Sequence, residues 1–210
     1  MNKFRLILKN ILFNIILTTA FLTCTMGQDK EKVADFINNT ASRVINVVQS
    51  KYSNEQKQEK LNVIFHESVN IDWMGKFALG KHYSKLSKNQ LEEYLVAYRG
   101  FLTNLYVSDF TQYNGEGLYI ESIKAISKSQ YVVNVKVGNP RNSTEQINIA
   151  YRIKDFGDKC KVRDIIVEGF SVILAQRSDF SSVISKEGIS SLIEKLRDKA
   201  KVINENFKNE

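Results

Sequence analysis

The chain has few of the residues that build covalent or metal-bound sites. Its 210 residues include two cysteines, two histidines and one proline. His66 and His82 are 16 positions apart, and neither belongs to an H-E-x-x-H motif or lies beside a C-x-x-C pair. The sequence therefore predicts no metal site and no catalytic residue, so we do not expect an enzyme. The single proline argues against a proline-rich linker between domains.

The N-terminus has the pattern of a secretory signal peptide. Three basic side chains lie within residues 3–9, an almost unbroken apolar run covers residues 11–22, and small residues precede Gln28. We interpret residues 1–27 as a cleavable signal peptide, which predicts that the mature protein is exported. Two alternatives remain open. An uncleaved anchor is one, because no A-x-A site is present, and a lipoprotein modified at Cys24 is the weaker other.

Removal of the signal peptide changes the charge and the cysteine count. Loss of its three basic residues lowers the net charge from +7 to +4. Such a charge allows loose attraction to anionic lipid surfaces but does not require a polyanionic partner, and we expect no nucleic-acid partner. Cys160 is then the one remaining cysteine, so the exported chain has no internal disulfide and depends on its core.

Residues 28–210 are predicted to form a single domain, in which a mainly helical part precedes the strands. Residues 28–113 carry apolar side chains at helical spacing, and Ser53–Gln56 and Ser87–Gln90 are capping boxes that start two helices. Residues 114–210 begin with period-two alternation and end with two amphipathic helices. The prediction is an α+β fold with a curled antiparallel four-stranded sheet, packed with an N-terminal helical subdomain and C-terminal helices. The expected strands cover residues 118–126, 131–137, 147–153 and 160–166.

The stretch Tyr151–Phe180 is where the predicted sheet gives way to helix. A turn at Asp155–Asp158 joins two alternating runs, and at Gly169 the apolar period changes from two to helical. We expect the junction to form one wall of an apolar pocket. Ser171 is predicted to cap the following helix.

Asp164 and Cys160, near this junction, are predicted to stabilise the fold and not to take part in chemistry. Asp164 is expected to hold either Arg177 or a loop amide. Cys160 is expected to face the core on its strand, although the lysines on either side of it leave a lowered thiol pKa as the alternative.

An ordered set of motifs resembles the MlaC (toluene-tolerance) family of periplasmic phospholipid-binding proteins. The runs VRDIIVEGFS (162–171) and QRSDF (176–180) carry the resemblance most clearly. Tyr83 and Cys160 depart from the family, which tends to have tryptophan at both positions. Further landmarks in the family's order are Asp72, Met74, Leu79-Gly80, Gln90, Tyr94, Phe101-Leu102, Tyr106, Tyr151 and Leu192–Leu196.

The resemblance implies a function as well as a fold. It implies a cystatin-like curled sheet beside helices, with buried acyl chains and a headgroup near the mouth, and no cofactor other than bound phospholipid. Its implied partners are an outer-membrane lipoprotein complex and an inner-membrane ABC transporter with an MCE-domain subunit, in a pathway that maintains outer-membrane lipid asymmetry. The resemblance, combined with the periodicity, gives the expected lipid-contacting residues as Tyr83, Tyr98, Leu102, Tyr106, Val133, Val135, Ile149, Tyr151, Ile166, Phe170 and Val172.

Two other classes of function compete with the phospholipid carrier. An enzyme on a cystatin-like sheet would need a desolvated acid or histidine in the cavity. An adaptor that only docks to membrane complexes would have its apolar residues in a closed, solid core.

Overall fold

The computed structural model describes the backbone of residues 27–111, 117–138 and 146–209, and the side chains of residues 27–108, 117–138 and 146–205. All of the predicted signal peptide except Gly27 lies outside the described residues. So does the segment between the expected strands 131–137 and 147–153, where the residues Asn-Pro-Arg-Asn at 139–142 predict a turn. No helix in the described ranges is both long enough and apolar enough to cross a membrane.

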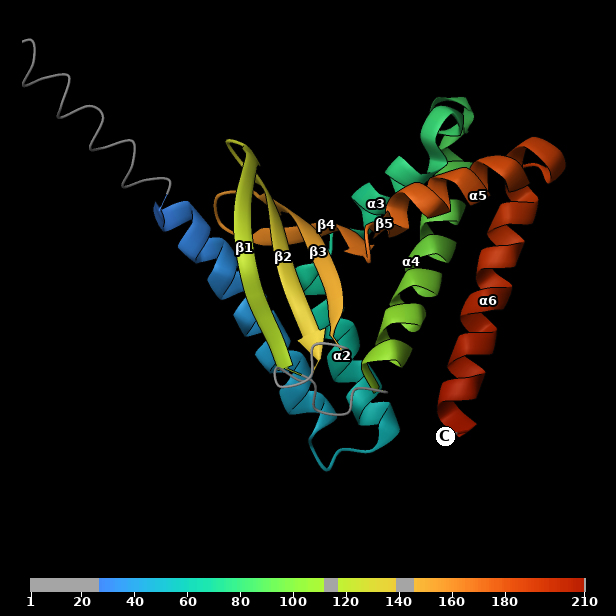
Figure 1. The fold of residues 1–210 in the computed structure, drawn as a ribbon. Coiled ribbons are helices and arrows are strands. Elements are labelled where there is room, and N and C mark those ends of the chain that lie inside the picture. The colour runs from blue at the N-terminus through green and yellow to red at the C-terminus, as the bar shows by residue number, and fades with distance from the viewer. Residues whose placement is uncertain (1–26, 112–116, 139–145, 210) are drawn as a thin grey trace, which may run out of the picture.

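Within the described residues, helices come first and last along the chain with a sheet between them, so the predicted α+β class is confirmed (Figure 1). A first helix covers residues 27–48. The later elements are α2 (Asn54–Ser68), α3 (Ile71–Leu79), the 3-10 helix η1 (Gly80–Lys85), α4 (Lys88–Thr111), β1 (Gly117–Ser127), β2 (Gln130–Gly138), β3 (Ile147–Asp155), β4 (Cys160–Val167), β5 (Phe170–Ser171), α5 (Val172–Glu187) and α6 (Ile189–Asn209).

The helix starts follow the capping patterns in the sequence. In α2 the backbone N–H of Gln56 donates to Ser53 Oγ at 3.3 Å, and the backbone N–H of Ser53 donates to Gln56 Oε1 at 3.1 Å. Ser87 and Gln90 form the same reciprocal pair at the start of α4. Each pair satisfies two backbone donors that a helix start leaves without partners, which is why both boundaries were predictable.

The sheet is antiparallel, with its strands in the order β1-β2-β3-β4-β5. Among the described residues it has five strands rather than the predicted four, because Phe170 and Ser171 pair briefly with the end of β4 before α5 begins. The first helix, blue in Figure 1, runs along the sheet, and α4 and α6 lie side by side at the opposite side of the molecule.

A bulge in β4 reverses the alternation of its side chains. Tyr151 pairs with Ile165 and Arg152 with Asp164, but Ile153 pairs with Val162, so Arg163 is an extra residue in the strand. An extra residue shifts every later side chain to the other face. Val162, Ile165 and Val167 consequently face the same side of the sheet. Strict alternation along the expected strand 160–166 would put Ile166 on the same face as Val162, but the bulge turns Ile166 to the other face.

The first helix packs onto the inner face of the sheet. Its Val33 and Ile37 are buried among side chains of β2, β3 and β4, which include Cys160. Burial raises the pKa of the Cys160 thiol, and Asp155 raises it further against the opposing effect of Lys32. Cys160 is therefore a core thiol as predicted, and the alternative of a lysine-activated thiol is wrong.

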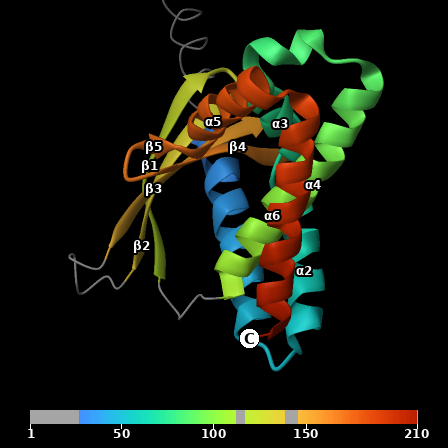
Figure 2. The same cartoon turned by 90° about the vertical axis from the view of Figure 1, so that its right-hand side faces the viewer.

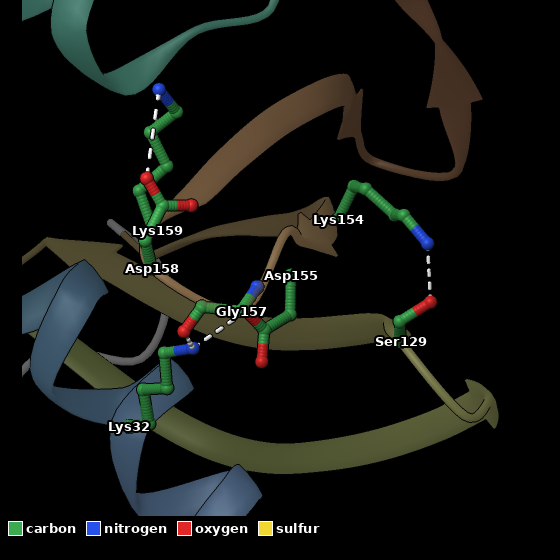
Figure 3. Close-up of polar contacts among 7 residues, drawn as sticks. All are labelled: Lys32, Ser129, Lys154, Asp155, Gly157, Asp158 and Lys159. Atoms are coloured by element: carbon green, nitrogen blue, oxygen red, sulfur yellow. Dashed lines mark hydrogen bonds and ion pairs between the residues drawn. The ribbon is translucent and has the colours of Figure 1, made fainter.

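A polar clamp joins the N-terminal half of the first helix to the β3–β4 turn (Figure 3). Lys32 Nζ donates to Asp155 Oδ1 at 2.6 Å and to the carbonyl oxygen of Gly157 at 2.9 Å. Asp155 Oδ1 also accepts from the backbone N–H of Gly157 at 2.8 Å. Nearby, Lys154 Nζ on β3 donates to Ser129 Oγ in the turn between β1 and β2. The clamp fixes one end of a helix whose other residues form a cavity wall.

Candidate functional site: an apolar cavity

A cavity of about 470 Å³ lies between the first helix, α2 and the inner face of the sheet. The first helix forms one wall, α2 and Val69 form the floor, and one residue of α4 closes a corner. The opposite wall consists of side chains from β1 to β4. The lining residues are Phe36, Ile37, Thr40, Ala41, Val44, Ile45, Ile64, Phe65, Ser68, Val69, Tyr106, Leu118, Val137, Ile149, Tyr151, Val162, Ile165 and Val167.

The lining is apolar and uncharged. None of these described residues is Asp, Glu, His, Lys or Arg. Thr40 and Ser68 direct their hydroxyls at each other, with an Oγ1–Oγ distance of 3.5 Å. Burial raises the pKa of Tyr151 to about 12, so its phenol stays neutral at physiological pH. Among the described residues, no group of three or more His, Cys, Asp and Glu side chains is arranged to hold a metal ion. The cavity therefore suits an apolar ligand.

Asp164 is buried behind the cavity wall and joins β4 to α5. Its carboxylate accepts from Ser171 Oγ at 2.7 Å and from the backbone N–H of Ile173 at 3.3 Å, and Arg152 Nε lies 3.6 Å from it. Ile173 belongs to α5, so the amide that donates to Asp164 lies in the first turn of a helix and not in a loop as predicted. Arg177 is not its partner, because that guanidinium lies over the ring of Phe77 instead. Ser171 caps α5 as predicted, accepting from the backbone N–H of Leu174 at 3.2 Å.

Three of the eleven expected lipid-contacting residues line the cavity. They are Tyr106 at the end of α4 and Ile149 and Tyr151 on β3. Val133 and Val135 lie on the same face of the sheet but are completely covered by the first helix and neighbouring strands. They form the core next to the cavity rather than its surface.

Four further expected residues belong to the helical part or its edge. Tyr98 and Leu102 are buried within the core that α3, α4, α5 and α6 share, and the Tyr98 hydroxyl donates to Gln176 Oε1 at 2.7 Å. Val172 is half-buried at the start of α5, and Tyr83 is 42% exposed on η1. The apolar stripe of α4 thus faces α3 and α5 along most of its length, and only its end reaches the cavity.

The last two expected residues lie at the β4–β5 corner. Ile166 faces away from the cavity because of the β4 bulge. Phe170 is 79% exposed and lies outside the lining.

The largest contribution that sequence reasoning missed comes from the first helix and α2. Phe36, Thr40 and Val44 recur at helical spacing, so the stripe itself was visible in the sequence. Nothing in that spacing says whether a helix covers the sheet or packs on other helices. The structure answers this by placing Ile37 against β2 and β3 and Val44 against Leu61.

Comparison with known proteins identifies the family of this chain. The model of the MlaC protein family matches residues 38–198. The chain is 23% identical over 191 residues to the intermembrane phospholipid transport system binding protein MlaC of Haemophilus influenzae, covering 87% of this chain and 88% of that protein. It is 23% identical over 180 residues to the toluene tolerance protein ttg2D of Pseudomonas putida, covering 83% and 82% of the two chains.

A solved structure with a similar fold is the phospholipid-binding protein from Ralstonia solanacearum, determined in complex with a phospholipid. Its TM-score is 0.68 at 16% sequence identity, and the match covers 80% of this chain and 97% of that one. The family match extends over most of the chain, from the middle of the first helix into α6, and includes most of the cavity wall. The chain belongs to the MlaC family.

Proposed function

We propose that this protein binds phospholipid and carries it through an aqueous compartment with acyl chain buried in the cavity. The observation that carries the proposal is the uncharged apolar cavity of about 470 Å³ between the first helix and the sheet. The names of the relatives support it, since one is an intermembrane phospholipid transport binding protein and the structural neighbour binds a phospholipid.

The volume and lining of the cavity suit an acyl chain. If a methylene group occupies about the volume of one water molecule in the liquid, roughly 30 Å³, the cavity accommodates about 16 such groups. That is one acyl chain of a membrane lipid. At about 0.8 kcal/mol for each methylene removed from water, its burial is worth about 13 kcal/mol. A bilayer interior supplies nearly the same free energy for that chain, so for this chain the exchange between membrane and protein is close to neutral and reversible.

The proposal extends to the compartment and the partners. The predicted signal peptide and the family support a periplasmic location for the proposed carrier. There it would shuttle phospholipid between an outer-membrane lipoprotein complex and an inner-membrane ABC transporter with an MCE-domain subunit. Near-neutral exchange requires such partners, because a reversible carrier cannot set the direction of transport by itself. Phospholipid is the proposed ligand, with no further cofactor.

The cavity also bears on the two competing functions. An enzyme using a cavity acid needs an ionisable side chain there, and the described lining residues offer hydroxyls only. An adaptor needs no interior space, whereas this fold leaves a hollow where solid packing would be more stable.

Filling the cavity tests the proposal. Ala41 lines the wall formed by the first helix, so Ala41→Trp places an indole in the cavity without burying a charge. Asn46 is exposed on the same helix, and Asn46→Trp is the matched control. Native mass spectrometry of gently purified protein should show bound phospholipid in the wild type and in the control, and at least tenfold less in Ala41→Trp. Circular dichroism should show all three folded.

Three results would contradict the carrier. The first is wild-type protein that is free of lipid after gentle purification. The second is lipid content in folded Ala41→Trp equal to that of the control. The third is a bound molecule without an acyl chain.

A further inference from the structure

A row of apolar side chains leads from the core, along the cavity wall, to the surface. Val135 pairs with Ile149, Ile149 with Val167, and Val167 with Phe170. Directly paired residues point to the same face of a sheet, so the row lies on the face that lines the cavity. Val135 is 1% exposed, Ile149 is half-buried, Val167 is 37% exposed and Phe170 is 79% exposed. Exposure rises strand by strand toward Phe170.

The turn before Phe170 is held in an unfavourable backbone conformation. Glu168 has φ 47° and Gly169 has φ 84°, so both turn residues lie in the left-handed region. For a residue other than glycine, asparagine or aspartate this costs about 1 kcal/mol or more, and such strain persists only where surrounding contacts impose it.

Contacts on both sides impose it here. The Glu168 carboxylate accepts from the backbone N–H of Asn148 at 2.6 Å and from Asn148 Nδ2 at 3.4 Å, and the Glu168 N–H donates to the Asn148 carbonyl at 2.9 Å. On the other side, Ser171 is fixed by its bonds to Asp164 and to the start of α5. Phe170 is thus a phenyl group held outward by a braced turn, and Figure 2 shows β5 on the side of the molecule away from α4 and α6.

The row is continuous with the cavity, so the ligand expected along it is the same acyl chain that the cavity holds. Val167 belongs both to the row and to the cavity lining, and Ile147 adds a half-exposed apolar side chain at the same end of β3. The charged side chain of the turn, Glu168, is engaged by Asn148. An acyl chain moving along this row would meet apolar surface at each strand, from solvent to cavity.

We infer that Phe170, Val167 and Ile149 form the entry path for the acyl chain, with Phe170 making the first contact as the chain leaves a bilayer. The inference rests on the proposed function. Phe170 lies outside the cavity, so it contributes little to how firmly a loaded lipid is held. Its contribution is to the rate of loading, because it shelters the leading methylenes from water before the cavity covers them.

The test separates loading rate from capacity. Vesicles of phosphatidylethanolamine and phosphatidylglycerol that contain a self-quenched fluorescent phospholipid are mixed with the purified full-length protein after lipid removal, and dequenching reports uptake. Phe170→Ser should load about tenfold more slowly than the wild type and reach the same final occupancy. Phe170→Leu should restore most of the rate. Leu174→Ser is the matched control, because Leu174 is 52% exposed nearby on α5 but lies outside the row, and it should load at the wild-type rate.

Each other outcome has a definite meaning. If the wild type never takes up lipid, the carrier function itself fails. If the wild type loads and Phe170→Ser loads equally fast, the entry path is wrong. Equal slowing by Phe170→Ser and Leu174→Ser would indicate general adhesion to vesicles and would also overturn the path. Lower final occupancy in Phe170→Ser would place Phe170 in the holding site instead.

Discussion

The clamp between the first helix and the β3–β4 turn gives a prediction with a calculable size. Lys32 donates to both the Asp155 carboxylate and the Gly157 carbonyl. Lys32→Met keeps most of the aliphatic stem but removes both bonds. Hydrogen bonds to charged groups contribute about 1.5–3 kcal/mol when shielded, and exposed ion pairs contribute about 0–1 kcal/mol.

Exposure places this clamp between those limits. The Lys32 side chain is 35% exposed and the Asp155 side chain 12%. We therefore expect Lys32→Met to lower the free energy of unfolding by about 1–1.5 kcal/mol, discounted for solvent screening. For a chain of this length that corresponds to a fall in Tm of about 2–6 °C.

The two pKa shifts give the clamp a characteristic pH window. The hydrogen bond to Asp155 raises the pKa of Lys32. Burial raises the pKa of Asp155, but the bonds from Lys32 and the Gly157 amide outweigh it, so the net pKa is lowered. The lowered pKa of Asp155 adds to the free energy of unfolding. This addition is complete above the unfolded pKa of about 4 and is lost as pH falls through the lower folded pKa. The raised pKa of Lys32 also adds to the free energy of unfolding. That addition is complete below about pH 10.4, the unfolded pKa, and is lost as pH rises through the higher folded pKa.

A double-mutant cycle is the decisive assay. Urea unfolding of wild type, Lys32→Met, Asp155→Asn and the double variant should give a coupling energy of about 1 kcal/mol at pH 7, falling toward zero as pH drops through the lowered folded pKa of Asp155. Lys159→Met is the control, because its contact with Asp158 is 3.9 Å long and largely exposed, and it should change stability by less than about 0.5 kcal/mol. Coupling under about 0.3 kcal/mol, or equal effects of Lys32→Met and Lys159→Met, would refute the reasoning.

Two further predictions concern tyrosines. Tyr98→Phe should destabilise the chain by about 1 kcal/mol in urea unfolding, because it leaves the Gln176 side chain without its donor, yet lipid content in native mass spectrometry should not change. Loss of lipid from Tyr98→Phe would indicate that Tyr98 contacts the lipid after all. Absorbance titration should show one phenol that ionises near pH 12 and disappears in Tyr151→Phe, whereas a Tyr151 step near pH 10 would mean that water reaches the hydroxyl freely.

The sequence was sufficient where structure is determined locally. Ser53–Gln56 and Ser87–Gln90 each contain both partners of their capping hydrogen bonds, and a glycine, Gly80, follows the last residue of α3 with φ 53°. The β3–β4 hairpin and the cap at Ser171 were likewise predictable from nearby residues. Each of these features depends on contacts within a few positions.

Prediction failed where distant contacts decide which way a side chain faces. Tyr98 and Tyr106 share one stripe of α4, but Tyr98 lies among Phe180 and Gln176 while Tyr106 stacks on Phe65 and reaches the cavity. Periodicity identifies the stripe and not its neighbours. The single extra residue Arg163 had the same effect on β4, since a bulge leaves no mark in an alternating pattern.

The position of the first helix has a consequence for how the protein is made. Lys32 and Asp155 are 123 residues apart, and the strands that this helix covers are synthesised long after it. During synthesis its apolar stripe has no sheet to cover, and the hollow does not exist until β4 has emerged. The nascent chain therefore exposes an aggregation-prone apolar surface for most of its elongation. Bringing the first helix onto strands more than a hundred residues away closes a long loop, which makes this late step of assembly slow. A holdase chaperone that shields the N-terminal segment should raise the yield of native protein more than one that acts on the finished chain.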